Sequence, residues 1–346
     1  PNGLPTSLST ALIQEKLKKE LGFNGLIVTD ALNMKGVANF SSSENVDLTA
    51  FQAGQDMLLI SLDIPKGIEA IEKAYLKGIV SESRLAHSVK KILMAKYKAG
   101  LHNYKPVKID GLYKDLNAPQ DTLLYAQAMA KAITLVKNEN RLLPLSKKTS
   151  LAHITLGDAS SVAYQKQLNR YAPITSIIDI TPENALVKTA PFDTLIISFH
   201  RSNENPWKAS NFNEKELAII KVLAQHKKII LNGFVRPYAL AQISEIQNID
   251  AILWSYQNSA IAQQLSVEIL FGVIGTYGTL PISVEKRYSV GHGLFLDSID
   301  RLGYATPAQV GFDPEKLKGL DELAKIAIDS MMTPGIQMLV ARRGQV

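Results

Sequence analysis

Short, continuously apolar runs alternate with helical patterns over the first 100 residues. Residues 25–30 and 56–60 have the length and composition of strands that are buried on both faces. Helical patterns cover residues 10–21, 68–76 and 85–98. Because strands that alternate with helices usually pair in parallel, this order predicts an α/β fold with a parallel sheet, either open or closed into a barrel.

A second strand–helix series follows residues 101–118, which lack periodicity and are rich in turn-forming residues, as is typical of a linker. A helix is expected over residues 122–133. The strands expected in the second series are residues 151–156, 174–180, 194–199, 228–232, 251–255 and 282–285. The helices expected there are residues 162–171, 214–225, 237–246 and 260–271. This pattern predicts a second α/β domain.

Composition excludes several classes of function. The chain has 346 residues, with 38 Lys and Arg against 32 Asp and Glu, and the lysines are scattered along polar helix faces. We therefore expect no nucleic-acid partner, which would require a denser basic run. The absence of cysteine excludes disulfides and thiolate nucleophiles. No apolar run reaches the ~18 residues of a membrane span. No clustered His or acidic residues indicate a metal, and no cofactor is expected.

Asp30 stands at the carboxyl end of the first predicted strand. Active sites of (β/α)8 barrels are built at this end of their strands, so Asp30 is a candidate catalytic carboxylate. Asp is also a common N-cap residue of the helix that follows a strand. From periodicity alone, the two interpretations have about equal weight.

Several short motifs occur in order and resemble glycoside hydrolase family 3, in particular its β-N-acetylglucosaminidase branch. The motifs are residues 5–9 (PTSLS), 21–25 (LGFNG), 28–34 (VTDALNM), 53–57 (AGQDM), 88–93 (SVKKIL), 138–145 (NENRLLPL) and 278–283 (GTLPIS). The resemblance implies that residues 1–104 are the C-terminal part of a (β/α)8 TIM barrel. Residues 105–148 would then be a linker and connecting helix, and residues 149–296 an α/β sandwich domain.

On this resemblance, Asp30 is the nucleophile of a retaining exo-β-N-acetylglucosaminidase that acts on cell-wall or chitin-type sugars through a covalent glycosyl–Asp30 intermediate. The carbohydrate partner would be a β-linked N-acetylglucosaminide. The acid/base would resemble an Asp–His pair upstream of position 1, so the chain is expected to be a fragment truncated at both ends and inactive alone. Asn33 and Met34 are candidates for substrate contact, although Met34 fits simple packing equally well.

The polar segment His200–Trp207 is a candidate rim of the active site, in which His200 reaches over a sugar and Trp207 stacks on it. An ordinary surface loop is the alternative. Other functions stay open: a β-glucosidase or β-xylosidase of the same family, a phosphorylase, or a non-catalytic sugar-binding module. Two Ser-x-x-Lys matches, at Ser88 and Ser283, are attributed to chance in a lysine-rich chain.

The C-terminal segment has a different character. Residues 310–317 and 334–344 resemble the entry to a serine hydrolase domain of the β-lactamase type, so residues 297–346 are expected to be a linker and the beginning of such a domain. A helix is expected over residues 313–330, and a strand over residues 337–341 that leads to a turn at Gly344. Fusion of a sugar hydrolase with a serine hydrolase suggests a bacterial, extracytoplasmic setting.

Overall fold

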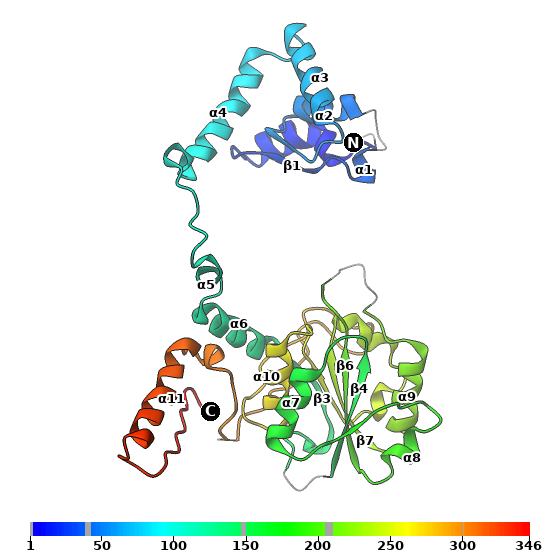
Figure 1. Cartoon of the computed structure of the whole chain (residues 1–346). Coiled ribbons are helices and arrows are strands. Elements are labelled where there is room, and N and C mark those ends of the chain that lie inside the picture. Colours follow the sequence, from blue (N-terminus) through cyan, green and yellow to red (C-terminus); the bar gives the residue numbers. More distant parts are fainter. Residues whose placement is uncertain (1–2, 39–42, 147–149, 205–209, 300) are drawn as a thin grey trace. The chain divides into compact units, whose positions relative to one another are not determined.

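The computed structural model describes residues 3–38, 43–146, 150–204, 210–299 and 301–346. The chain divides into two compact units, residues 1–109 and 110–346. Both units combine helices with parallel strands, which confirms the predicted α/β class (Figure 1).

The first unit is built around two short strands. Its elements are η1 (Thr6–Leu8), η2 (Ala11–Glu20), β1 (Val28–Ala31), α1 (Lys35–Ala38), α2 (Ser43–Ala53), β2 (Met57–Leu59), α3 (Ile64–Leu76), α4 (Glu82–Lys98) and η3 (Leu101–Asn103). Both strands coincide with predicted ones. The first predicted helix, residues 10–21, forms as a π-helix, η2, in which Leu21 N–H bonds to the Lys16 carbonyl oxygen at 3.0 Å.

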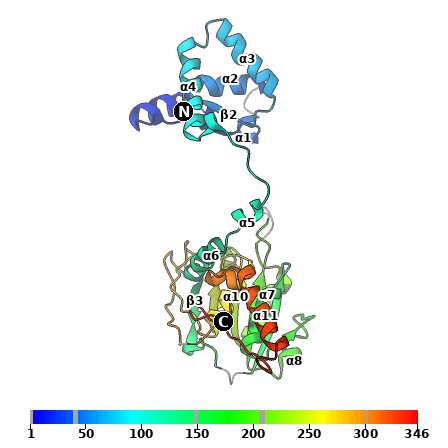
Figure 2. The same ribbon diagram turned by 60° about the vertical axis from the view of Figure 1, so that its left-hand side comes forward.

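Strands β1 and β2 pair in parallel, with Val28 opposite Met57 and Ala31 opposite Leu59. Helix α2 contacts β2, and α3 packs against α2 (Figure 2). One strand face is exposed, since Val28 is 48% and Leu59 45% accessible. The expectation of strands buried on both faces is therefore wrong for this unit, because only one strand face is packed against its helices.

The second unit contains a six-stranded sheet in the order β3-β8-β7-β6-β4-β5, in which only β3 is antiparallel to its neighbour. The strands are β3 (Thr134–Asn138), β4 (Leu151–Gly157), β5 (Thr175–Ile177), β6 (Thr194–His200), β7 (Lys228–Phe234) and β8 (Ala251–Trp254). The helices are α5 (Leu112–Leu116), α6 (Pro119–Ala132), η4 (Glu139–Arg141), α7 (Val162–Tyr171), α8 (Ala185–Thr189), α9 (Glu214–Ala224), η5 (Pro237–Gln242), η6 (Ile246–Asn248), α10 (Ala260–Leu270), η7 (Pro307–Val310) and α11 (Pro314–Asp329).

Helices cover both faces of this sheet, α7 and α10 on one side and α8 and α9 on the other (Figure 1). Each face has its own apolar cluster. Strand β6 contributes to both clusters. Leu195 and Ile197 belong to the cluster that includes residues of α9, whereas Ile196 belongs to the cluster that includes residues of α7 and α10. Alternating side chains point to opposite faces of a strand, so a continuously apolar strand serves both layers.

Five segments of the second unit differ from expectation, one of them the strand expected over residues 174–180, which forms only as β5. Thr134–Asn138, assigned to the connecting segment, forms the edge strand β3. Residues 237–246 form a 3₁₀ helix only as far as Gln242. Residues 282–285 make a single bridge from Val284 to Tyr288, and residues 337–341 form no strand. Residues 337–341 are exposed and have no strand to pair with. The predicted turn at Gly344 is confirmed, because Arg342 and Gln345 form a bridge around this glycine, whose φ is +75°.

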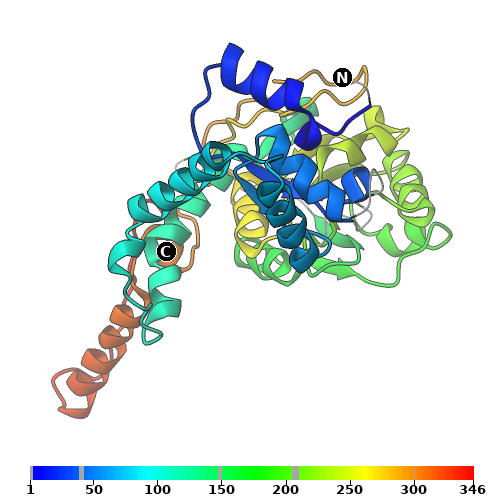
Figure 3. The ribbon, with the colours of Figure 1, turned by 90° about the horizontal axis from the view of Figure 1, so that it is seen from above.

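Helix α11 lies at the edge of the second unit, away from the sheet (Figure 3). None of its residues is buried, and Leu323 and Ile326 are 63% and 56% accessible. The expectation of a serine hydrolase domain that begins in this segment stays a prediction. Among the helices that the structure describes, none has the length and apolar character to cross a membrane.

Candidate active site

Asp30 lies at the carboxyl end of β1 with its side chain exposed. Alternation along the strand places Val28 and Asp30 on one face and the buried Thr29 on the other. Thr29 Oγ1 accepts a hydrogen bond of 2.9 Å from Leu59 N–H, which locks β1 to β2 beside the acid. Asp30 Oδ1 accepts one of 2.7 Å from Ala31 N–H. Asp30 therefore does not cap the next helix, and its carboxylate faces outward on a strand that is held from behind.

Asp30 also lines a pocket of 510 Å³ within the first unit. The lining includes Ser7 of η1, Thr29 of β1, Met34 and Gln55. A mixed polar and apolar lining around one exposed carboxylate is suited to a small polar ligand with a hydrophobic face, such as a sugar ring.

A buried acid, Asp56, joins three segments immediately behind this pocket. Its Oδ2 accepts hydrogen bonds from Ile27 N–H at 3.0 Å and from Lys91 Nζ at 3.1 Å. Its Oδ1 accepts one from Ser88 Oγ at 2.6 Å, with an Arg84 nitrogen 3.8 Å away. Because Ile27 leads into β1 and Ser88 and Lys91 belong to α4, Asp56 ties the start of β1 to that helix.

Burial is the largest influence on Asp56 and opposes its ionisation, but the donors Ser88, Ile27 N–H and Lys91 together hold its pKa below the usual 3.8. The Ser88–Lys91 spacing, attributed to chance from the sequence, has a shared role in the structure, since residues three apart on a helix face the same way. In the sequence, Asp56 lies in the motif of residues 53–57, and Ser88 and Lys91 lie in that of residues 88–93, but neither motif shows that these side chains meet.

The two candidates nearest to Asp30 differ in placement. Met34 is 53% exposed and lines the pocket. Asn33 is exposed, is not part of the pocket lining, and its N–H donates to the Ile60 carbonyl oxygen at 3.1 Å. The geometry therefore brings Met34 to Asp30 and uses the Asn33 backbone to hold the loop that follows.

His200 is wholly buried at the end of β6 in the second unit. Its Nδ1 lies 2.7 Å from Asn258 Oδ1, and its ring stacks on Phe234 with centroids 4.5 Å apart. Burial lowers the pKa of His200 to about 4, against a smaller opposing effect of the Asn258 hydrogen bond. In this arrangement the ring faces the core of the unit. Trp207 lies outside the described residues.

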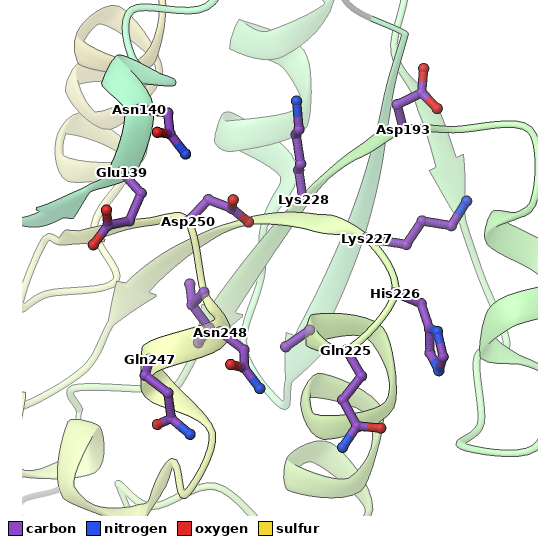
Figure 4. A pocket seen from close by; sticks show the side chains of 12 residues that line it. Glu139, Asn140, Asp193, Gln225, His226, Lys227, Lys228, Gln247, Asn248 and Asp250 are labelled. Carbon is purple, nitrogen blue, oxygen red and sulfur yellow. The ribbon is translucent and has the colours of Figure 1, made fainter.

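A larger pocket, of 870 Å³, occurs in the second unit at the opposite, amino ends of β6, β7 and β8 (Figure 4). Its polar lining comes from the amino ends of these strands and the segments before them, and from η4, which follows β3; Asp193, His226, Asp250 and Glu139 are among the side chains. Open parallel sheets bind ligands at the carboxyl ends of their strands. Because this pocket lies at the amino ends of the strands, it is a weaker candidate for a ligand site than the Asp30 pocket.

Within the described parts of the chain, no group of three or more His, Asp or Glu side chains is arranged to hold a metal ion. At the Asp30 pocket, the carboxylate is held on a strand and can act as nucleophile or as general base.

The chain is similar in sequence and in structure to several known proteins. The chain is 29% identical over 145 residues to a beta-N-acetylglucosaminidase/beta-glucosidase of Cellulomonas fimi, covering 42% of this chain and 26% of that protein. The structure of a glycoside hydrolase family 3 beta-N-acetylglucosaminidase from Paenibacillus aligns with a TM-score of 0.60 and 21% identity, over 81% of this chain and 55% of that one. A beta-glucoside phosphorylase, BglX, aligns with a TM-score of 0.65 and 20% identity, over 79% and 52%.

The chain thus spans about a quarter of the Cellulomonas relative and little more than half of each solved structure. Two family models match it in the order expected. Residues 1–95 match the glycosyl hydrolase family 3 N terminal domain, and residues 133–304 match the family 3 C-terminal domain. With both domains matched across the two units, the chain belongs to glycosyl hydrolase family 3.

Proposed function

We propose that the chain contributes the nucleophile, Asp30, to a retaining exo-β-N-acetylglucosaminidase. The observation that carries the proposal is the exposed Asp30 carboxylate at the carboxyl end of β1, in a pocket of the family 3 N-terminal domain. The strand end supplies rigidity, and the Thr29 bond behind it restricts rotation of the backbone. A carboxylate fixed in this way can attack an anomeric carbon along a defined line.

The reaction would proceed in two steps. Asp30 attacks the anomeric carbon while an acid protonates the departing glycosidic oxygen, and a glycosyl ester of Asp30 forms. Water, activated by the same group acting as base, then attacks the anomeric carbon, and the sugar is released with retained configuration. The acid/base group, which the family resemblance assigns to an Asp–His pair outside these residues, belongs to the same proposal.

The barrel is also a proposal. The exposed face of β1 and β2, which includes Val28, Met57 and Leu59, is apolar enough to pack against further strands of a (β/α)8 barrel. A cell-wall or chitin-type N-acetylglucosaminide is the proposed substrate, because β-N-acetylglucosaminidases occur among both the relatives and the solved structures to which the chain is similar.

A phosphorylase is the second candidate, and the similarity to the beta-glucoside phosphorylase favours it. In that case phosphate replaces water in the second step. A β-glucosidase or β-xylosidase of the same family would use the same nucleophile on a different sugar. A non-catalytic sugar-binding module would bind sugar at the same pocket without turnover.

The deciding experiment measures release of an aryl leaving group from β-N-acetylglucosaminide, β-glucoside and β-xyloside by the full-length protein, with and without phosphate. Asp30→Asn should lower kcat by roughly 10⁴-fold or more, the scale on which loss of a covalent nucleophile acts. Asp63→Asn is the matched control, because Asn replaces Asp equally well as the N-cap of α3. Full activity of Asp30→Asn refutes the proposal, and sugar affinity without turnover in the wild type indicates the binding module.

A further inference from the structure

A second buried acid, Asp47 of α2, has no part in the contacts described so far. It is 2% exposed, and its Oδ2 accepts a hydrogen bond from Ser61 Oγ. Gly67 of α3 packs so closely that a Cβ added there would lie 2.1 Å from the same oxygen. Its other oxygen, Oδ1, has no hydrogen-bond partner in the described structure. Leaving a buried acceptor unpaired is costly, so a carboxylate at this position is not explained by stability.

Ser61 directly follows Ile60, which has a φ of +46° at the carboxyl end of β2. A β-branched residue rarely adopts this left-handed conformation. Such strain persists only where the surrounding contacts over-determine it, and it is concentrated at functional sites. The bond from Ser61 to the buried Asp47 anchors the residue immediately after the strained one.

The strained turn holds the loop that follows Asp30. The Ile60 carbonyl oxygen accepts from Asn33 N–H at 3.1 Å, and the Leu59 carbonyl oxygen accepts from Leu32 N–H at 3.0 Å. Leu32, 1% exposed, belongs to one apolar cluster with Val46 of α2. Helix α2 therefore supports the loop after Asp30 in two ways. Val46 of α2 shares an apolar cluster with Leu32, and Asp47 of α2 accepts the hydrogen bond of Ser61, next to the Ile60 turn.

We propose that Asp47 is a positioning residue for Asp30. Through Ser61 it fixes the Ile60 turn in the conformation that presents a carbonyl oxygen to Asn33, and this fixes the backbone two to three residues beyond the nucleophile. The role in catalysis rests on the proposed function of Asp30, whereas the structural link between Asp47 and the Asn33 amide does not.

The structural link is tested by hydrogen exchange in the chain itself. In Asp47→Ala and in Ser61→Ala, the amides of Leu32 and Asn33 should exchange roughly tenfold faster or more, as expected when a buried hydrogen bond is lost. Amides of α4 should keep their wild-type rates, which separates a local effect from general destabilisation. Gln52→Ala, an exposed change on the same helix, is the control. Unchanged exchange of Leu32 and Asn33 in a folded Ser61→Ala protein overturns the inference.

Should Asp47→Ala fail to fold, Ser61→Ala and Gly67→Ala keep the inference testable. Gly67→Ala places a methyl group against the Asp47 oxygen that accepts from Ser61 and should also speed exchange at Asn33. Normal exchange in both variants counts against the role of Asp47.

The catalytic role is tested by steady-state kinetics of the full-length protein. Asp47→Ala and Ser61→Ala should lower kcat roughly 10- to 100-fold while KM changes by less than roughly threefold, because misplacement of a reacting group affects the transition state most. Asp47→Asn keeps an acceptor oxygen for Ser61 and should recover most of kcat. A purely structural Asp47 would leave the kcat of the folded enzyme unchanged.

The two proposals fail in different ways. If Asp30→Asn retains activity, the nucleophile assignment fails, and hydrogen exchange at Asn33 still decides whether Asp47 positions the loop. If Asp30→Asn is inactive while the Asp47 and Ser61 variants match the wild type in kcat and exchange, only the positioning role fails.

Discussion

Ser88 Oγ donates a hydrogen bond of 2.6 Å to Asp56 Oδ1, which joins helix α4 to the acid that also holds Ile27 N–H at the start of β1. Lys91, one helical turn further, approaches the other oxygen of the same carboxylate at 3.1 Å. The strand that carries Asp30 is thus held at its beginning by a charge network and at its end by the Asn33–Ile60 hydrogen bond.

We predict that Asp56→Asn lowers the free energy of unfolding of the first unit by about 3 kcal/mol, because it leaves the half-buried Lys91 and Arg84 without their counter-charge. Urea denaturation monitored by circular dichroism measures the loss. Asp63→Asn, in the same unit, should cost less than about 0.5 kcal/mol because the helix cap is kept. A similar small loss for Asp56→Asn would show that the network adds little to stability.

The same residue sets a pH dependence. Because the folded-state pKa of Asp56 lies below the usual 3.8, its contribution to stability is fully present above that pH and is lost as pH falls through the lower, folded value. The free energy of unfolding of the wild type should therefore fall more steeply below about pH 4 than that of Asp56→Asn. Parallel curves for the two proteins would contradict this origin of acid sensitivity.

Much of the fold could be predicted from apolar patterning. The strands around Val28, Ile196 and Ile230 are predictable because short, continuous apolar runs between helical patterns are typical of strands in a parallel sheet. Strand β3 is not. Thr134 follows the end of α6 with only Ile133 between them, and no Gly, Pro or Asn separates the two elements. Its partner, β8, lies more than 100 residues later, so its pairing depends on tertiary structure.

In the candidate site, too, some features follow from local sequence patterns and others depend on tertiary contacts. The position of Asp30 at a strand end followed from pattern, and its proposed role came from the family resemblance. The partners of Asp56 could not be predicted, because Ile27 and Ser88 are brought together only by the fold. The polar composition after Phe199 predicts a loop from His200 onward, whereas β6 continues through His200 and the residue is buried. A polar residue at a strand end is ambiguous in sequence, since a buried partner such as Asn258 is invisible there.

Two buried histidines should make the second unit sensitive to acid. Burial, followed for His153 by the charge of His200, lowers the pKa values of His153 and His200 from 6.5 to about 3 and about 4. Below pH 6.5 the unfolded chain binds protons that the native state does not, so stability falls by about 1.4 kcal/mol per pH unit for each histidine. The double variant His153→Gln/His200→Gln should show a flatter dependence between about pH 6 and pH 4.

Urea denaturation at a series of pH values tests this, with His226→Gln as the control because His226 is exposed. The control should reproduce the wild-type slope. If the double variant also keeps the wild-type slope, the acid sensitivity arises from other groups.

Gly157 ends β4 at a φ of +103°, and a Cβ there would lie 1.9 Å from the His200 carbonyl oxygen. We predict that Gly157→Ala destabilises the second unit by about 3 kcal/mol or more, the combined cost of backbone strain and overpacking. Gly319→Ala in α11 is the matched control, because nothing lies within 4 Å of a Cβ there and Ala favours a helix. Thermal unfolding compares the two, and a neutral Gly157→Ala would mean that β4 and β6 can separate at little cost.

The C-terminal segment meets the second unit at a buried acid, Glu268 of α10. Its Oε1 accepts from Tyr171 Oη at 2.6 Å and from Tyr304 N–H at 3.3 Å. Its Oε2 and the Oε1 of Gln345 both lack a partner in the described structure, and a Cβ on Gly303 would lie 2.3 Å from each of them. A buried carboxyl oxygen that has no donor is less costly when the acid is protonated.

Burial raises the pKa of Glu268 and outweighs the hydrogen bonds of Tyr171, Tyr304 N–H and Gln167 and the charge of Arg170, all of which act in the other direction. Relative to the unfolded chain, the native state therefore favours the protonated form of this acid. Stability from this group is fully present below the usual pKa of 4.5 and is lost as pH rises through the folded value. Glu268→Gln, whose amide can donate to Gln345, should be as stable as the wild type at pH 5.

At pH 7 the same variant should be more stable than the wild type by about 1 to 2 kcal/mol, because it removes the cost of an unpaired buried acceptor. Urea denaturation at both pH values measures the difference, and Glu322→Gln on the exposed face of α11 should change nothing. A Glu268→Gln protein that is less stable than the wild type at pH 7 would show that native Glu268 is ionised and depends on its donors. The Gln345 contact would then require an amide orientation that offers Nε2 to the carboxylate.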